Sequence, residues 1–201
     1  MKTLHLVLFP TLFAFIIMWA MYTHATIYVF DANLDGPSEF PPNASPGTGF
    51  AQVTFDDVAN LMTVNVTFSG LLGTTTASHI HAATASPGSG TAAVATTTPY
   101  FAGFPIGVTS GTHNNTLDMT QTSSYNPTYI TGNGGTTAGA EAALLGAMLA
   151  DEAYLNIHTT VVPGGEIRGF LTLVPEPGIA TLFVLGAIIP AIWRKRDKLR
   201  G

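Results

Sequence analysis

Three histidines have the residue type and spacing to bind a metal ion. His79 and His81 are separated by one residue, and on a strand residues two apart point to the same face, about 6.5–7 Å apart. His158 follows a strand-like pattern in which Leu155 and Ile157 take the core face, so it falls on the outer face. If the two strands approach, three imidazoles meet with room for a fourth ligand, a set that suits copper or zinc. The alternative is that all three are ordinary surface residues.

A glycine-rich turn, Pro163-Gly164-Gly165, lies just beyond this third histidine and precedes Glu166 and Arg168. These two side chains are expected on one face of the following strand. A structural interpretation makes them a stabilising ion pair at a hairpin. A functional interpretation has Arg168 guide an anion toward the histidines. His113 lies in a loop-rich region and is a weaker candidate ligand.

The elements that must hold these residues are predicted to be mainly strands. Apolar residues alternate with polar ones, most clearly in Met62, Val64, Val66 and Phe68, as in a half-buried antiparallel strand. The predicted strands are 28–34, 50–55, 62–68, 77–82, 154–159 and 167–173, and a run of helix-forming residues at 140–150 predicts one short helix. Residues 84–135 are rich in Gly, Ser, Thr, Pro and Asn, which predicts long loops with one or two short strands. We expect an all-β, antiparallel Greek-key sandwich or barrel with one short helix before the penultimate strand.

The composition of residues 26–173 excludes several functions. These residues contain one arginine, Arg168, no lysine and ten acidic side chains, so their formal net charge is −9. A domain without a basic stripe does not bind nucleic acid. The chain has no cysteine, which rules out disulfides, thiolate catalysis and cysteine-based metal sites. No Ser-His-Asp order, phosphate-binding loop or carboxylate dyad is apparent, so we expect no enzyme activity.

Residues 1–25 have the pattern of a secretory signal peptide. Lys2 provides the charged start, an apolar run extends from Leu4 to Met21, and Ala25 is the predicted cleavage position. The alternative is an uncleaved N-terminal anchor, because the apolar run is long. Residues 26–173 then form the folded domain.

Residues 174–201 have the pattern of a membrane-sorting tail. Pro175-Glu176-Pro177 precedes an apolar stretch from Ile179 to Trp193, predicted as a membrane helix, and a basic cluster follows with Arg194, Lys195 and Arg196. The basic cluster should stay cytoplasmic, which places the domain outside. These features resemble the PEP-CTERM sorting signal of Gram-negative bacteria, whose members are processed by an exosortase. A plain tail anchor requires the same topology and differs only in that the helix is retained.

Several motifs in the domain resemble those of the CHRD (chordin-type) domain. They are Gly36-Pro37-Ser38-Glu39-Phe40-Pro41-Pro42, Phe68-Ser69-Gly70-Leu71, Ser78-His79-Ile80-His81, Asn156-Ile157-His158-Thr159 and Pro163-Gly164-Gly165-Glu166-Ile167-Arg168-Gly169. The resemblance covers most of residues 27–173. It implies an extracellular domain without an established enzymatic activity.

A more distant resemblance is to Cu/Zn superoxide dismutase. It implies that His79, His81 and His158 are copper ligands and that Arg168 guides superoxide. This chain departs from that family because it lacks the disulfide, the zinc loop and a bridging histidine. Its acidity also opposes the positive field that would attract superoxide. The resemblance therefore informs the fold and a metal site rather than catalysis.

Taken together, these patterns predict an exported cell-surface or extracellular-matrix protein that acts as a non-catalytic binding module. It would meet signal peptidase and exosortase, be held in the inner membrane before processing, and then reach the cell surface or the medium. A copper- or zinc-binding protein is the alternative, and an oxidoreductase acting on superoxide is the weakest. Bound metal would distinguish the metal-binding protein from the plain binding module, and turnover of superoxide would distinguish the oxidoreductase from both.

Overall fold

A computed structural model describes residues 26–175 of the chain. The predicted signal peptide and nearly all of the predicted sorting tail, including its membrane helix, lie outside these residues. Within residues 26–175, no helix has the length and apolar character needed to cross a membrane.

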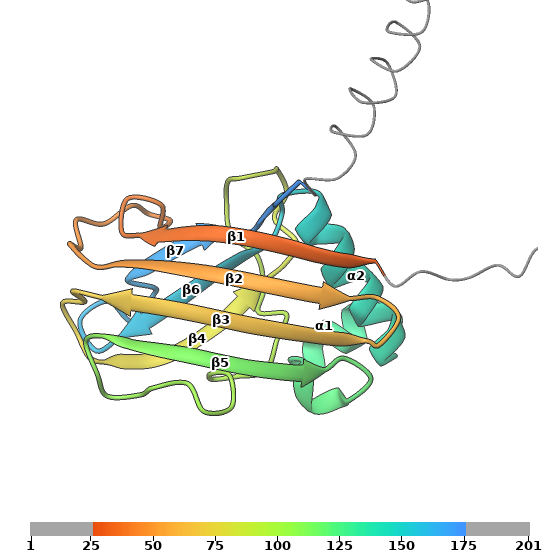
Figure 1. The fold of residues 1–201 in the computed structure, drawn as a ribbon. Helices are drawn as coiled ribbons and strands as arrows, with labels where there is room; N and C mark the ends of the chain where they lie inside the picture. The colour runs from red at the N-terminus through yellow and green to blue at the C-terminus, as the bar shows by residue number, and fades with distance from the viewer. Residues whose placement is uncertain (1–25, 176–201) are drawn as a thin grey trace, which may run out of the picture.

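One antiparallel sheet dominates the described residues and confirms the predicted all-β class. Its strands are β1 (Ile27–Asp35), β2 (Thr48–Asp56), β3 (Leu61–Ser69), β4 (Thr75–His81), β5 (Gly111–Asp118), β6 (Tyr154–Thr159), β7 (Ile167–Phe170) and β8 (Thr172–Leu173). Their order is β4-β6-β7-β1-β2-β3-β5, with β8 paired to β1. In Figure 1, β1, β2, β3 and β5 form a front layer and β4, β6 and β7 lie behind it. The sheet therefore curls into a half-barrel.

The core lies between these two layers because each strand alternates inward apolar residues with outward polar ones. Phe30, Val53 and Val64 line the front layer and are fully buried. Ile80 and Leu155 on the back layer are also fully buried. The core-face positions predicted for Leu155 and Ile157 are thus confirmed, and the alternate residues of β4 and β6 point to the opposite side of the back layer.

The helical content exceeds the single helix predicted. The segment predicted as 140–150 is α2 (Thr137–Leu149), which begins where the Thr136 side chain accepts a hydrogen bond from the Gly139 amide. A second helix, α1 (Pro127–Gly132), lies in the region predicted as loops, where the Asn126 side chain caps it and Pro127 occupies its first position. A short 3₁₀ helix (Thr122–Ser124) precedes it. Figure 1 shows both α-helices at one end of the sheet.

Two other strand predictions differ in extent. The predicted strand 167–173 is two strands, because Leu171 is buried between β7 and β8 and its amide donates to the Ala153 carbonyl. In the region predicted to be mostly loop, β5 is an eight-residue strand paired with β3 over its whole length.

A long connection between β4 and β5 covers the edge of β4. The Ala82 amide donates to the Ala93 carbonyl, the Ala95 amide donates to the Ile80 carbonyl, and the Ser78 amide donates to the Pro99 carbonyl. Residues 92–100 therefore lie along β4 and cover the outer side of the back layer.

Candidate metal centre

The structure brings His79, His81 and His158 together, as the sequence predicted. Strands β4 and β6 are neighbours, and His158 lies opposite Ala77, one alternation away from His79 on the same face. One ring nitrogen from each histidine lies within 4.8 Å of the other two. Three nitrogens bound to one ion at 2.0–2.1 Å are about 3.3–3.6 Å apart, so binding requires the widest pair to move inward by about 1 Å.

Burial distinguishes this cluster from the exposed surface residues considered as the alternative. His79 is 6% exposed, and His81 and His158 are partly buried. The connection after β4 and the turn after β6 cover this side of the back layer and contact all three rings. The alternative that the three histidines are ordinary exposed surface residues is therefore wrong.

A backbone carbonyl orients each imidazole ring. His79 Nδ1 lies 3.1 Å from the Pro99 oxygen, His81 Nδ1 lies 2.8 Å from the Ala92 oxygen, and His158 Nδ1 lies 2.9 Å from the Pro163 oxygen. A carbonyl oxygen can only accept, so each Nδ1 carries a hydrogen and donates it. In the neutral rings, Nε2 then bears the lone pair. Proteins use this arrangement to orient metal-binding histidines.

The three Nε2 lone pairs have no adequate partner in the described residues. His79 Nε2 and His158 Nε2 lie 3.0 Å apart, so two acceptors face each other. His81 Nε2 is buried without a hydrogen-bond partner. Buried polar atoms are normally paired, and a single cation would satisfy all three nitrogens at once.

A proton is poorly suited to that task because the site opposes a positive charge on the rings. Burial, followed by the neighbouring His81 and His158, lowers the pKa of His79 to about 3. Burial also lowers the pKa of His81 to about 4 and lowers the pKa of His158. The histidines are thus neutral near pH 7, which is the form that binds metal.

A second layer of side chains supports the cluster from the β7 side. Tyr154 stacks on His81, with ring centroids 4.7 Å apart and an interplanar angle of 7°. The Arg168 guanidinium lies 4.6 Å from the centre of the Tyr154 ring. Because β6 lies between β4 and β7, Tyr154 separates His81 from Arg168.

Arg168 and Glu166 occupy separate environments rather than pairing with each other. Arg168 is 3% exposed; its Nε lies 3.8 Å from Glu39 and donates to the Ser38 carbonyl, while its Nη1 donates to the Gly90 carbonyl at 2.9 Å. Burial outweighs this ion pair and raises the pKa of Glu39 to about 7.

Glu166 is fully buried and joins four segments of the chain. Its carboxylate accepts hydrogen bonds from Ser45 Oγ, Thr159 Oγ1 and the amides of Leu72 and Gly73. The proposed ion pair between Glu166 and Arg168 is therefore replaced by a structural carboxylate and by the pair of Arg168 with Glu39.

His113 lies outside the cluster. It is on β5, where its ring packs against Phe101 and Phe104 with centroids 5.8 and 5.4 Å away.

The residues near the site that the sequence analysis did not assign to it are Glu39, Tyr154 and Asn156. Asn156 lies opposite both His79 and Arg168, and its position beside Tyr154 and His158 on the outward alternation was the available signal.

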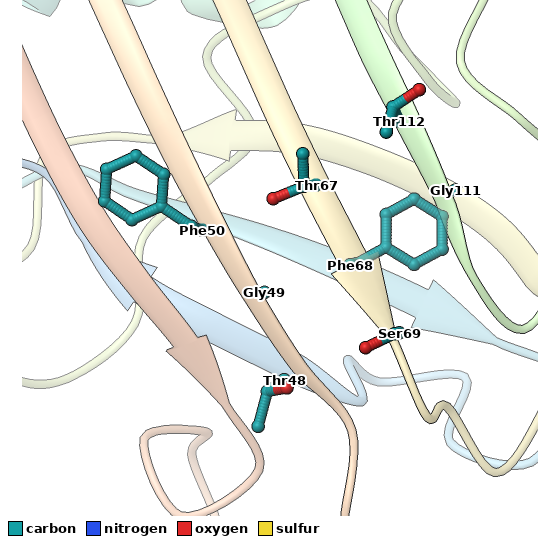
Figure 2. Close-up of a pocket in the computed structure, with 8 residues that line it drawn as sticks. All are labelled: Thr48, Gly49, Phe50, Thr67, Phe68, Ser69, Gly111 and Thr112. Carbon is teal, nitrogen blue, oxygen red and sulfur yellow. The ribbon is translucent and has the colours of Figure 1, made fainter.

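A groove on the front layer is one of several hollows outside the cluster. Figure 2 shows its residues on β2, β3 and β5, including Phe50, Thr67 and Thr112, around a volume of about 480 Å³. None of the residues that line it titrates near neutral pH, so it offers no acid–base or metal chemistry. The histidine cluster is thus the candidate site for chemistry.

Comparison with known proteins agrees with this fold and these motifs. A family model described as the CHRD domain matches residues 30–171, which is most of the chain. The match includes all three clustered histidines, Glu39 and Arg168. No curated protein and no solved structure matches the chain. The protein belongs to the CHRD domain family.

Proposed function

We propose that this protein is an exported, non-catalytic binding module whose ligand is a copper or zinc ion held by His79, His81 and His158. The convergence of three Nε2 lone pairs carries this proposal. Each ring is fixed by its own carbonyl partner, so the arrangement is prepared before the ion arrives. Imidazole nitrogen suits both copper and zinc, and each residue would supply one ligand.

Export is part of the proposal. CHRD domains are typical of extracellular proteins, and this one holds a packed core without any cysteine. Residues 1–25 would direct export and be removed by signal peptidase. The tail, 174–201, would hold the chain in the inner membrane until an exosortase acts near Pro175-Glu176-Pro177, after which the domain remains at the cell surface or is released.

Superoxide dismutation receives no comparable support. The arginine that would guide the anion is buried, and both Nε and Nη1 already donate to carbonyl oxygens. Those bonds fix Arg168 to the covering loops, which favours a structural role.

Calorimetric titration with Cu(II) and Zn(II) tests the proposal. Residues 26–175 contain every described strand and the core, and they should be prepared without a metal-binding tag. We expect one-to-one binding that is lost in His79→Ala and in His158→Ala. The matched control is His113→Gln, which removes a buried histidine outside the cluster and should leave binding unchanged. Equal binding by the wild type and all three variants would instead indicate that the metal binds to scattered surface carboxylates.

A further inference from the structure

We propose that the histidine cluster selects monovalent copper over divalent ions, which makes it a Cu(I) site of high reduction potential. This inference rests on the proposed function, because it concerns the same three ligands. It follows from the charge of the ligands, the burial of the site, the position of Arg168 and the number of donors.

The ligand set adds no negative charge. Three neutral imidazoles leave bound Cu(I) with a charge of +1, whereas Cu(II) or Zn(II) keeps +2. No described carboxylate belongs to the cluster. Glu39 lies 3.8 Å from Arg168 and has one oxygen buried without a partner, and Glu166 accepts four hydrogen bonds. The metal therefore lacks the anionic ligand that would favour the higher charge.

Burial penalises a divalent ion more strongly than a monovalent one. The cost of placing an ion in a medium of low dielectric constant rises with the square of its charge, so +2 costs about four times as much as +1. His79, at 6% exposure, belongs to such an environment.

Arg168 places a fixed positive charge one ring away from the ligands. Its guanidinium lies 4.6 Å from the Tyr154 ring centre, and that ring stacks on His81. Glu39 is 3.8 Å from the guanidinium. Burial raises the pKa of Glu39 to about 7, so its carboxyl offsets the arginine charge only in part near neutral pH. Repulsion from this arginine acts twice as strongly on a divalent ion.

The number of donors also favours Cu(I). Three ligands complete a trigonal Cu(I) centre, whereas zinc is tetrahedral and Cu(II) prefers a tetragonal arrangement. The buried polar atom on the same strand that could serve as a fourth donor is Asn156 Oδ1, which has no hydrogen-bond partner among the described residues. It is a neutral amide oxygen and a weak ligand for copper.

The test is to measure two dissociation constants on the same protein. Cu(I) affinity is measured without oxygen by competition with a chromogenic Cu(I) chelator, and Cu(II) affinity by competition with nitrilotriacetate. We expect Cu(I) to bind at least tenfold more tightly than Cu(II), and every tenfold raises the Cu(II)/Cu(I) potential by about 59 mV relative to the free ions. Equal or tighter binding of Cu(II) would overturn the inference, whereas absence of binding in both states would overturn the proposed function as well.

A near-isosteric variant tests the charge argument directly. Asn156→Asp places a carboxylate beside His79 and should strengthen Cu(II) binding at least tenfold more than Cu(I) binding, lowering the potential by about 59 mV or more. Asn65→Asp makes the same change on the front layer, where β2, β1 and β7 separate it from β6, and should not alter the ratio. Equal changes in both affinities for Asn156→Asp would contradict the argument. If that variant does not fold, the ratio of the Cu(I) and Cu(II) dissociation constants of the wild-type protein still tests the inference.

Discussion

Replacing Glu166 by Gln should destabilise the domain more than any other isosteric change of a described carboxylate. Glu166 Oε1 accepts from Ser45 Oγ at 2.6 Å and from the Leu72 amide at 2.5 Å. Its Oε2 accepts from Thr159 Oγ1 at 2.5 Å and from the Gly73 amide at 3.1 Å. Glutamine retains one acceptor oxygen and turns an NH₂ group toward the other two donors. A hydroxyl can rotate to accept from it, but a backbone amide cannot.

The expected loss follows from these contacts. One buried amide loses its acceptor, which costs about 1–3 kcal/mol, and the surviving bonds lose the contribution of a charged acceptor. Together these effects amount to about 4 kcal/mol of the free energy of unfolding. For a domain of this size that is a fall of roughly 8–16 °C in Tm. The four donors come from three segments, at Ser45, Leu72-Gly73 and Thr159, so the loop 36–47, the β3–β4 connection and the turn after β6 should loosen as well.

The loss should depend on pH in a defined direction. Burial by itself would raise the pKa of Glu166, but its four hydrogen bonds outweigh burial and lower that pKa. Because the folded pKa lies below the unfolded value of about 4.3, the carboxylate stabilises the fold at higher pH. This stabilisation is lost as the pH falls through the folded pKa. The difference between wild type and variant should therefore be constant from pH 5 to 8 and shrink in acid.

Denaturant unfolding followed by circular dichroism measures this difference. Tryptophan fluorescence is unsuitable, since both tryptophans, Trp19 and Trp193, lie outside residues 26–175. A chelator should be present so that metal binding does not contribute. Glu152→Gln, whose carboxylate accepts no hydrogen bond from a described residue, is the matched control and should change stability by less than about 0.5 kcal/mol. A loss below about 1 kcal/mol for Glu166→Gln, or a difference that grows in acid, would refute the reasoning.

Three further predictions concern the histidines, the metal and the backbone. Because the folded pKa values of His79 and His81 are about 3 and 4, below the unfolded value of about 6.5, the metal-free protein should lose stability as pH falls from 6.5 toward 3, and His79→Phe should flatten that dependence in an acid titration. Copper at about 100 times its Kd should add about 2.7 kcal/mol to the free energy of unfolding, and thermal melts should show no such gain in His158→Ala. Gly169→Ala should cost about 1–3 kcal/mol in denaturant unfolding because its Cβ would overlap the Asn33 carbonyl, whereas a Cβ at Gly164 meets nothing within 4 Å and Gly164→Ala should be nearly neutral.

The sequence predicted the elements that carry a regular period. Alternation located β1, β2, β3, β4 and β6 to within a few residues, because an inward apolar residue at every second position is required to fill the core. The same alternation placed His79, His81 and His158 on one side of the back layer. Their convergence then followed from the pairing of β4 with β6, which the pattern of the strands did not specify by itself.

What the sequence could not predict depends on segments without a period. The loop 36–47 and residues 82–110 have no repeating apolar spacing, yet they provide the carbonyl oxygens of Pro99, Ala92 and Ser38 that fix two histidines and Arg168. Helix α1 is too short to show an apolar face, and its only local signals are Asn126 and Pro127. The sequence did not predict that the histidine cluster is buried, because the segments that cover it have no repeating apolar spacing.

The lone arginine of the domain shows how the covering loops and the metal site depend on each other. Arg168 holds the loop 36–47 through Ser38 and Glu39 and holds the connection after β4 through Gly90, while its guanidinium packs on Tyr154. A lysine could not replace these contacts, because its single ammonium group lacks the planar set of donors. A charge that the domain uses nowhere else is thus placed where it joins two loops and one aromatic ring behind His81. The same contacts that make the arginine unsuited to attract an anion give the histidines a rigid, positively charged support, and this support disfavours a divalent ion at the cluster.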